Sequence, residues 1–181
     1  MKNILLLGGT GFVGRQICEQ LVRAGMRVTV ATRREANASA VQILPGVTVL
    51  EADVHDEAAL ARLLPGHDAV VNLIGVLHGN QQRFERAHVE LPRKLARALQ
   101  TAGIRRLVHV SALGASAEGP SIYQRSKAAG EAVLTEAGLE LTLLRPSVIF
   151  GAGDSFLTLF ARLQAVVPVM QIGRASCRER V

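Results

Sequence analysis

The chain of 181 residues is long enough for one domain with a substantial core and too short for two ordinary domains. Hydrophobic residues make up 49% of it and charged residues 20%, a balance that excludes global disorder. A net charge of +6 raises nucleic acid as a partner, but aromatic residues are only 3% and the basic residues are scattered, so we expect no nucleic-acid binding.

The cysteine pattern indicates a reducing compartment. Cys18 and Cys177 are the only cysteines, and the five histidines show no ligand spacing, so we expect neither a disulfide framework nor a metal site. The N-terminus lacks the apolar stretch of a secretory signal, and no apolar run approaches the ~18 residues of a membrane span. We expect a cytoplasmic protein, and peripheral attachment to the inner face of the cytoplasmic membrane stays open.

Six short apolar runs, rich in Val, Ile and Leu, alternate with amphipathic segments. The runs read as strands that are buried on both faces of a parallel sheet. They cover residues 3–9, 27–32, 47–53, 69–75, 106–112 and 141–147. Helical patterns lie at 12–24, 36–44 (a weaker one), 56–64, 84–102 and 121–137, with Gly25, Gly103 and Gly138 placed as C-terminal caps. This alternation predicts an α/β fold, a Rossmann-type doubly wound parallel sheet with helices on both faces.

The first strand–helix junction carries a glycine motif. "LLLGGTGFVGRQI" spaces Gly8, Gly11 and Gly14 as G-x-x-G-x-x-G. A pyrophosphate needs such a tight turn, without Cβ atoms in its way and with helix N–H groups aimed at its charge. The motif predicts dinucleotide binding; the alternative is a tight turn whose glycines serve packing alone.

The ends of the second and third strands bear on the choice of dinucleotide. In "VATRRE", Arg33 and Arg34 stand where an NAD site has a carboxylate for the ribose 2′-hydroxyl. Guanidinium groups suit a 2′-phosphate, so NADP(H) is favoured while NAD(H) stays open; the alternative is two solvated loop arginines. Asp53, at the end of the third strand, is expected near the adenine, whereas Asp56 fits the N-cap of the following helix.

Tyr123 and Lys127 are the candidate reaction centre. Their spacing of four puts both on one face of a helix, where an ammonium lowers the pKa of a neighbouring phenol. Such a pair also arises by chance, but Tyr123 is the only tyrosine, and Ser111 ends the fifth strand at the edge where ligands bind. A Ser–Tyr–Lys set beside a nicotinamide is suited to hydride transfer.

Taken in order, these motifs, with "NLIG" after the fourth strand and "RPSVIFG" after the sixth, resemble the extended short-chain dehydrogenase/reductase superfamily over residues 1 to about 169. "FERAHVELPRKLARALQTAGIRRLVHVSALGA" and "LRPSVIFGAGDSFLTLFARL" are similar to its atypical branch, typified by the NAD(P)H-binding accessory subunit of respiratory complex I, alpha-subcomplex subunit 9. That branch has bacterial and ubiquinone-biosynthesis relatives. The resemblance implies a protein of the epimerase/dehydratase type, associated with a respiratory or quinone-biosynthesis complex.

The resemblance also implies residue roles. The pyrophosphate contacts would be Gly8, Thr10, Gly11, Phe12, Val13 and Gly14. Arg33 and Arg34 would face the adenosine phosphate, Asp53 and Val54 the adenine, and Leu73, Ile74 and Gly75 would line the cofactor. Pro146, Ser147 and Val148 would border the nicotinamide. Ser111, Tyr123 and Lys127 would form the catalytic set, with Tyr123 and Lys127 also touching the cofactor.

Two functions remain open. Extended members often carry "NxAG" where this chain has "NLIG", and the complex I branch binds its nucleotide without a required turnover. One hypothesis is therefore an oxidoreductase or epimerase acting on a quinone- or lipid-related substrate. The other is a non-catalytic nucleotide-binding subunit or assembly factor.

The C-terminal end departs from the pattern. We expect a helix over 155–169 as the end of the dinucleotide-binding domain, 1–169, and a disordered tail over 170–181. The tail could serve as a short basic arm, but "IGRASCRERV" is also the translation of a common sequencing-adapter oligonucleotide. Because relatives continue here into a substrate-binding part, we favour the hypothesis that residues from about Gln171 onward are an assembly artefact and that the natural protein is longer.

Overall fold

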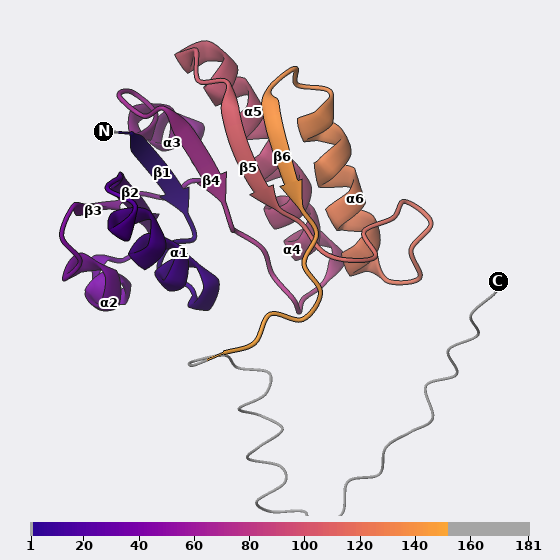
Figure 1. Cartoon of the computed structure of the whole chain (residues 1–181). Helices are drawn as coiled ribbons and strands as arrows, with labels where there is room; N and C mark the ends of the chain where they lie inside the picture. Colours follow the sequence, from indigo (N-terminus) through magenta and orange to yellow (C-terminus); the bar gives the residue numbers. More distant parts are fainter. Residues whose placement is uncertain (1, 152–181) are drawn as a thin grey trace, which may run out of the picture. The chain divides into compact units, whose positions relative to one another are not determined.

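The computed structural model describes residues 2–151 (Figure 1). The chain divides into two compact units, one ending at Ser147 and one beginning at Val148. The helix expected over 155–169 and the tail expected over 170–181 lie outside the described residues. Within the described part, none of the helices has the length and apolar character that crossing a bilayer requires.

Six parallel strands form one sheet in the order β3-β2-β1-β4-β5-β6, which confirms the predicted doubly wound fold (Figure 1). The strands are β1 (Asn3–Leu7), β2 (Arg27–Thr32), β3 (Val47–Glu51), β4 (Ala69–Asn72), β5 (Arg106–Val110) and β6 (Glu140–Leu144). All but β2 end two or three residues earlier than the apolar runs predict. The residues beyond these ends leave the sheet and form the loops at its carboxyl edge.

The helices follow the predicted order, with two differences. They are α1 (Phe12–Arg23), η1 (Glu35–Ala38), α2 (Ser39–Gln42), α3 (Glu57–Leu63), α4 (Gln81–Glu85), η2 (Arg86–Glu90), α5 (Leu91–Ala102) and α6 (Ile122–Thr135). The helix expected over 84–102 begins three residues earlier and contains the π-helical turn η2, and the weak pattern at 36–44 forms a 3₁₀ turn and one α-helical turn. As predicted, the Asp56 carboxylate accepts hydrogen bonds from two N–H groups of α3, and Gly25, Gly103 and Gly138 have positive φ.

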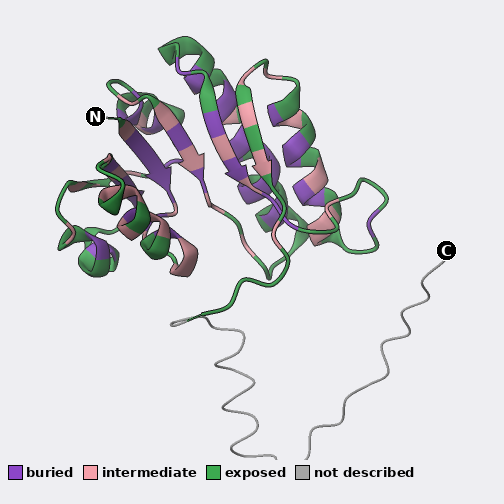
Figure 2. Ribbon diagram, viewed as in Figure 1, coloured by how far each residue is buried: buried purple, intermediate pink, exposed green. Residues whose placement is uncertain are grey.

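Alternate side chains of the central strand β1 enter two separate cores. Leu6 packs with Val28, Val30 and the buried side chains of α1 and α2 on one face. Leu5 and Leu7 pack on the other face, with Val70, Leu107 and the leucines of α3, α5 and α6. Figure 2 shows β1 almost wholly buried and β6, at the sheet edge, largely exposed or half-buried. Burial of each leucine contributes about 2 kcal/mol, so the continuous apolar runs hold the sheet between its two helix layers.

Helix α6 crosses η2 at a single glycine. A Cβ atom built on Gly130 would lie 1.9 Å from the carbonyl oxygen of His88, far inside van der Waals contact. The two backbones can approach this closely only because residue 130 has no side chain. This contact sets the distance between α6, which carries Tyr123 and Lys127, and the segment that carries His88.

We expect Gly130→Ala to destabilise the protein by about 2–3 kcal/mol, because the added methyl group must push α6 away from η2. Alanine's higher helix propensity would offset only about 1 kcal/mol of this cost. Urea unfolding measures the difference. Ala132→Ser, on the exposed part of the same helix, is the control and should change stability by less than about 0.5 kcal/mol. Equal stability of Gly130→Ala and the wild type would contradict the close crossing.

Candidate functional site

The loop between β1 and α1 has the geometry of a phosphate-binding turn. Gly8 has φ +85°, and its carbonyl oxygen accepts a hydrogen bond from Gly11 N–H at 3.1 Å. A Cβ atom on Gly14 would lie 2.3 Å from the Gly8 oxygen, so the helix start packs directly on the turn. Gly11 is the N-cap of α1 and has no side chain with which to cap it, which leaves first-turn N–H groups for an anion. This cradle fits a dinucleotide pyrophosphate.

A cavity of about 340 Å³ lies over the carboxyl ends of β1 to β4. Of the predicted cofactor residues, its lining includes Gly8, Thr10, Arg33, Asp53, Val54, Ile74 and Gly75. It also includes Ala31, Thr32, Asn37, Ala52, His55, Val76, Arg83, Arg86 and Ala87. These residues surround a space that runs from the end of β2 to the loop after β4.

The other predicted cofactor residues lie outside that lining. Gly11, Phe12, Val13 and Gly14 form the turn and the start of α1, and Leu73 packs against the core beside α1. Arg34 is exposed, and its carbonyl oxygen accepts a hydrogen bond from Thr32 Oγ1 at 3.0 Å. The Pro146 carbonyl oxygen accepts from Leu113 N–H at 2.8 Å, and Ser147, like Val148 in the second unit, is exposed.

Three arginines give this cavity a positive lining. Arg33 comes from the end of β2, Arg83 from α4 and Arg86 from η2. None of the three side chains makes a hydrogen bond or an ion pair with another of residues 2–151. Burial, followed by the charge of Arg86, lowers the pKa of His55 in the same cavity. Sequence analysis indicated Arg33 but not Arg83 or Arg86. The sequence alone does not show that α4 and η2 lie beside the cavity at the carboxyl ends of the strands.

Lys127, of the candidate reaction centre, is buried, with 5% of its surface exposed. Its Nζ atom donates a hydrogen bond to the Val110 carbonyl oxygen at 3.0 Å and lies 3.2 Å from the position of a Cβ on Gly75. Burial lowers the pKa of Lys127 to about 8, and the charge of Glu131 opposes this shift. The structure thus brings Lys127 from α6 to the loop after β4 that lines the cavity.

Tyr123 differs from its prediction in one respect. We expected Lys127 to lower the pKa of the phenol, but burial raises the pKa of Tyr123 above its usual value. The Lys127 ammonium is directed at the Val110 carbonyl group instead. The Tyr123 ring packs edge-on against Phe84 and His88, with centroid distances of 6.0 and 5.6 Å. In this arrangement Tyr123 is a protonated phenol at neutral pH and therefore a proton donor.

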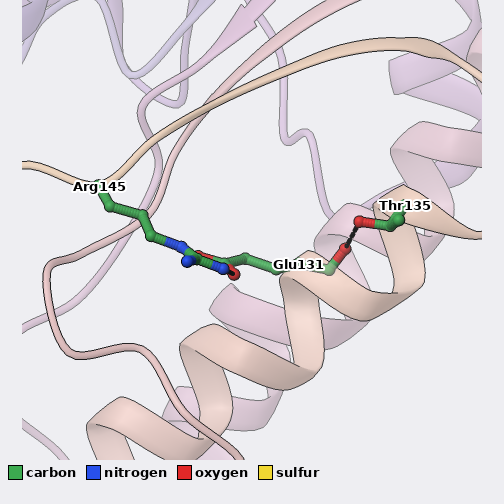
Figure 3. A network of polar contacts seen from close by, with 3 residues as sticks. All are labelled: Glu131, Thr135 and Arg145. Carbon is green, nitrogen blue, oxygen red and sulfur yellow. Dashed lines mark hydrogen bonds and ion pairs between the residues drawn. The ribbon is translucent and has the colours of Figure 1, made fainter.

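Ser111 and Glu131 are two further buried polar residues near Lys127. Ser111 Oγ is buried, and among the buried side-chain polar atoms of residues 2–151 it is the one without a hydrogen-bond partner of normal geometry. Glu131 is bound by the guanidinium of Arg145, with Nε 2.9 Å from Oε1 (Figure 3). Burial alone would raise the pKa of Glu131, but Arg145 and the nearby Ser111 hydroxyl outweigh it and hold that pKa below its usual value. Sequence analysis identified no partner for Glu131.

Two buried histidines, His88 and His109, lie near Lys127 as well. His109 on β5 lies 3.1 Å from Asn72 Nδ2 on β4, and His88 accepts a hydrogen bond from Val76 N–H at 3.0 Å. Burial, and after it the charge of Lys127, lowers the pKa of each histidine to about 4. Both rings are therefore neutral at physiological pH. Sequence analysis missed His88, because nothing within the helix pattern of residues 84–102 shows that it faces Val76.

A family model described as NAD(P)H-binding matches residues 8–156, most of the chain. The chain belongs to this NAD(P)H-binding family. The matched range includes the glycine turn, the arginine-lined cavity and the Ser111, Tyr123 and Lys127 positions.

Two curated relatives lie close to this NAD(P)H-binding chain. It is 33% identical over 183 residues to mouse mitochondrial NADH dehydrogenase [ubiquinone] 1 alpha subcomplex subunit 9, covering 97% of this chain and 48% of the relative. It is 31% identical to the ceramide reductase of Caulobacter vibrioides, covering 93% of this chain and 53% of the relative. The chain thus spans about half the length of the curated relatives it matches.

A solved structure shares the fold of this NAD(P)H-binding chain. The UDP-glucuronic acid 4-epimerase of Bacillus cereus, in complex with NAD, superposes with a TM-score of 0.73 at 18% identity. The superposition covers 82% of this chain and 58% of the epimerase. At this identity the likeness supports the fold alone, in agreement with the strand order.

We expect Lys127→Met to stabilise this NAD(P)H-binding chain by about 2 kcal/mol at pH 7, because the methionine removes an ammonium that burial has taken out of water. In the wild type the unfolded chain binds more protons than the folded one between about pH 8 and the ordinary lysine value of 10.5, so wild-type stability rises with pH across this window. The advantage of the variant should therefore shrink over the same window. Urea unfolding at several pH values measures it, and a variant less stable than the wild type at pH 7 would refute the argument.

Proposed function

We propose that the chain is the dinucleotide-binding part of an NADP(H)-dependent oxidoreductase of the epimerase/dehydratase type, associated with a respiratory or quinone-related complex. The observation that carries this proposal is the buried Lys127 beside Gly75, at one end of the cofactor cavity. A buried ammonium lowers stability, so its burial beside the cavity supports a functional role for Lys127 in the site.

The preference for NADP(H) rests on charge in the adenosine half of the cavity. Arg33 stands at the end of β2, and Arg83 and Arg86 add two further unpaired guanidinium groups around the same space. Asp53 is the single carboxylate in the lining. A 2′-phosphate neutralises such a surplus of positive charge, whereas a 2′-hydroxyl does not. Arg34, outside the lining, has no part in this proposal.

In the proposed reaction, Tyr123 donates its proton to the oxygen of a substrate carbonyl, because burial keeps the phenol protonated. Ser111 Oγ, which makes no hydrogen bond of normal geometry within the described residues, donates a hydrogen bond to the same oxygen. Lys127 holds the nicotinamide ribose. The nicotinamide ring supplies the hydride when it is bound.

The likeness to the ceramide reductase supports a lipid-like substrate, and the likeness to a subunit of the mouse NADH dehydrogenase [ubiquinone] supports a quinone. A second candidate is a nucleotide-binding subunit of a respiratory complex without turnover, and the identity to the mouse complex I subunit over 97% of this chain favours it. Either role would place the protein at the inner face of the cytoplasmic membrane, held there through its partners.

Tyr123→Phe separates these two candidates. We expect it to keep NADPH affinity within about twofold and to lower NADPH oxidation by about 100-fold or more, because a general acid is lost while the ring remains. The assay measures NADPH oxidation with a panel of quinones and keto-lipids. Undiminished turnover in the variant would exclude Tyr123 as the acid. A wild type without turnover, whose removal stops assembly of a respiratory complex, would instead establish the second candidate.

Arg33→Gln tests the cofactor preference. We expect about a tenfold loss of NADPH affinity with little change for NADH, because one charge-assisted contact to the 2′-phosphate is lost. Isothermal titration calorimetry measures both affinities. Arg34→Gln is the matched control and should leave both unchanged, since Arg34 does not line the cavity. Tight binding of NADH without binding of NADPH by the wild type would overturn the preference.

A further inference from the structure

His88 connects three parts of the site that are distant in sequence. It lies in η2, with 1% of its surface exposed, between the loop after β4 and the first turns of α6. Its Nε2 atom is 3.0 Å from Val76 N, and its Nδ1 atom is 2.9 Å from Ser126 Oγ. The imidazole therefore bridges a segment that lines the cofactor cavity and the helix that carries Tyr123 and Lys127.

The hydrogen bonds fix the tautomer of this ring. A backbone N–H can only donate, so His88 Nε2 must accept from Val76 and the ring proton must lie on Nδ1. Nδ1–H then donates to Ser126 Oγ, and the Ser126 hydroxyl donates to the Tyr123 carbonyl oxygen at 2.9 Å. Each donor in this series, from Val76 N–H to the Ser126 hydroxyl, therefore has one acceptor.

The surroundings keep the ring neutral. Burial comes first, and then the charges of Lys127 on α6 and of His109 on β5 disfavour an imidazolium. Phe84 and Tyr123 contact the ring itself, with centroids at 5.6 Å in both cases. A protonated ring would lose the acceptor that Val76 N–H requires, so the bridge exists only in the neutral form.

The backbone around His88 shows that its position is tightly set. A Cβ on Gly75 would lie 3.5 Å from His88 Nε2 and 3.2 Å from Lys127 Nζ, so the cavity wall directly adjoins both side chains. On the other side, the His88 carbonyl oxygen touches Gly130 of α6. The π-helical turn η2 widens the helix here, as such turns often do at functional sites.

We propose that His88 is a positioning residue, whose neutral imidazole holds the Gly75–Val76 segment and the first turns of α6 together so that Tyr123 and Lys127 face the nicotinamide end of the site. The inference rests on the proposed function, because it concerns the same dinucleotide and the same proton donor. Histidine suits the role because one rigid ring offers an acceptor on one edge and a donor on the other.

Two variants separate the hydrogen bonds from the ring. His88→Gln keeps one acceptor and one donor on a side chain that can reach both partners, whereas His88→Phe keeps a ring against Phe84 and Tyr123 but removes both hydrogen bonds. His78→Phe is the control, because His78 is exposed in the loop before α4 and makes no hydrogen bond within residues 2–151. Far-ultraviolet circular dichroism verifies that each variant is folded.

The first measurement follows Tyr123 alone. It is the only tyrosine and the chain has no tryptophan, so the ultraviolet absorbance of tyrosinate reports a single group in the full-length protein. The wild type should titrate above the ordinary value of 10.0, since burial raises the pKa of Tyr123. We expect the His88→Gln and His78→Phe midpoints to match the wild type. The His88→Phe midpoint should fall toward 10.0, because the first turn of α6 loosens and admits water.

The second measurement is NADPH affinity by calorimetry. We expect about a fivefold loss in His88→Phe and less than about a twofold change in His88→Gln, because only the former leaves Val76 N–H without a partner. A His88→Phe variant with the wild-type midpoint and affinity overturns the proposal. So does a His88→Gln variant whose midpoint or affinity departs from the wild type, and this variant decides alone if His88→Phe does not fold. If the wild type binds no dinucleotide, the proposed function fails while the tyrosine titration still tests the bridge.

Discussion

The buried ammonium of Lys127 influences the protonation and the hydrogen bonds of the groups around it in the candidate reaction centre. It donates to the Val110 carbonyl oxygen at the end of β5, and its charge helps to keep His88 and His109 neutral. Glu131, one helical turn further along α6, offsets part of its burial cost through space. Glu131 is in turn bound by Arg145, which follows β6 (Figure 3). Two positive charges, those of Lys127 and Arg145, thus link α6 to the carboxyl ends of β5 and β6.

The backbone segments around Lys127 approach one another closely. Gly130 lets α6 touch η2, and Gly75 lets the loop after β4 pass beside Lys127 and His88. The phosphate turn uses the same device, since Gly14 packs on the carbonyl oxygen of Gly8. Glycines at helix crossings therefore matter as much to this site as the glycines of the turn that first indicated a dinucleotide.

The sequence predicts the sheet well, because each strand has its own apolar run and β1 is buried on both faces. It also predicts Asp56 as the N-cap of α3. Arg33, Asp53 and Gly75, which were expected at the cofactor, line the cavity because each follows a strand that the sequence predicts. It could not show that His88 faces Val76 or that Arg145 binds Glu131, because these contacts join segments 12 and 14 residues apart across different elements. The predicted direction of the Tyr123 pKa shift was wrong. The spacing of two residues on a helix shows that their side chains are near each other, but it does not show to which acceptor the ammonium donates its hydrogen bond.

The two halves of the site differ in what they require of the fold. The adenosine half is formed by β1 to β4 and by exposed arginines, groups that remain solvated and lower stability little. The candidate reaction centre contains a buried ammonium, two buried neutral histidines and the buried hydroxyl of Ser111, all of which oppose folding unless neighbours compensate. The burial of Lys127 and His88 beside Gly75 therefore supports the proposed function at this end of the sheet.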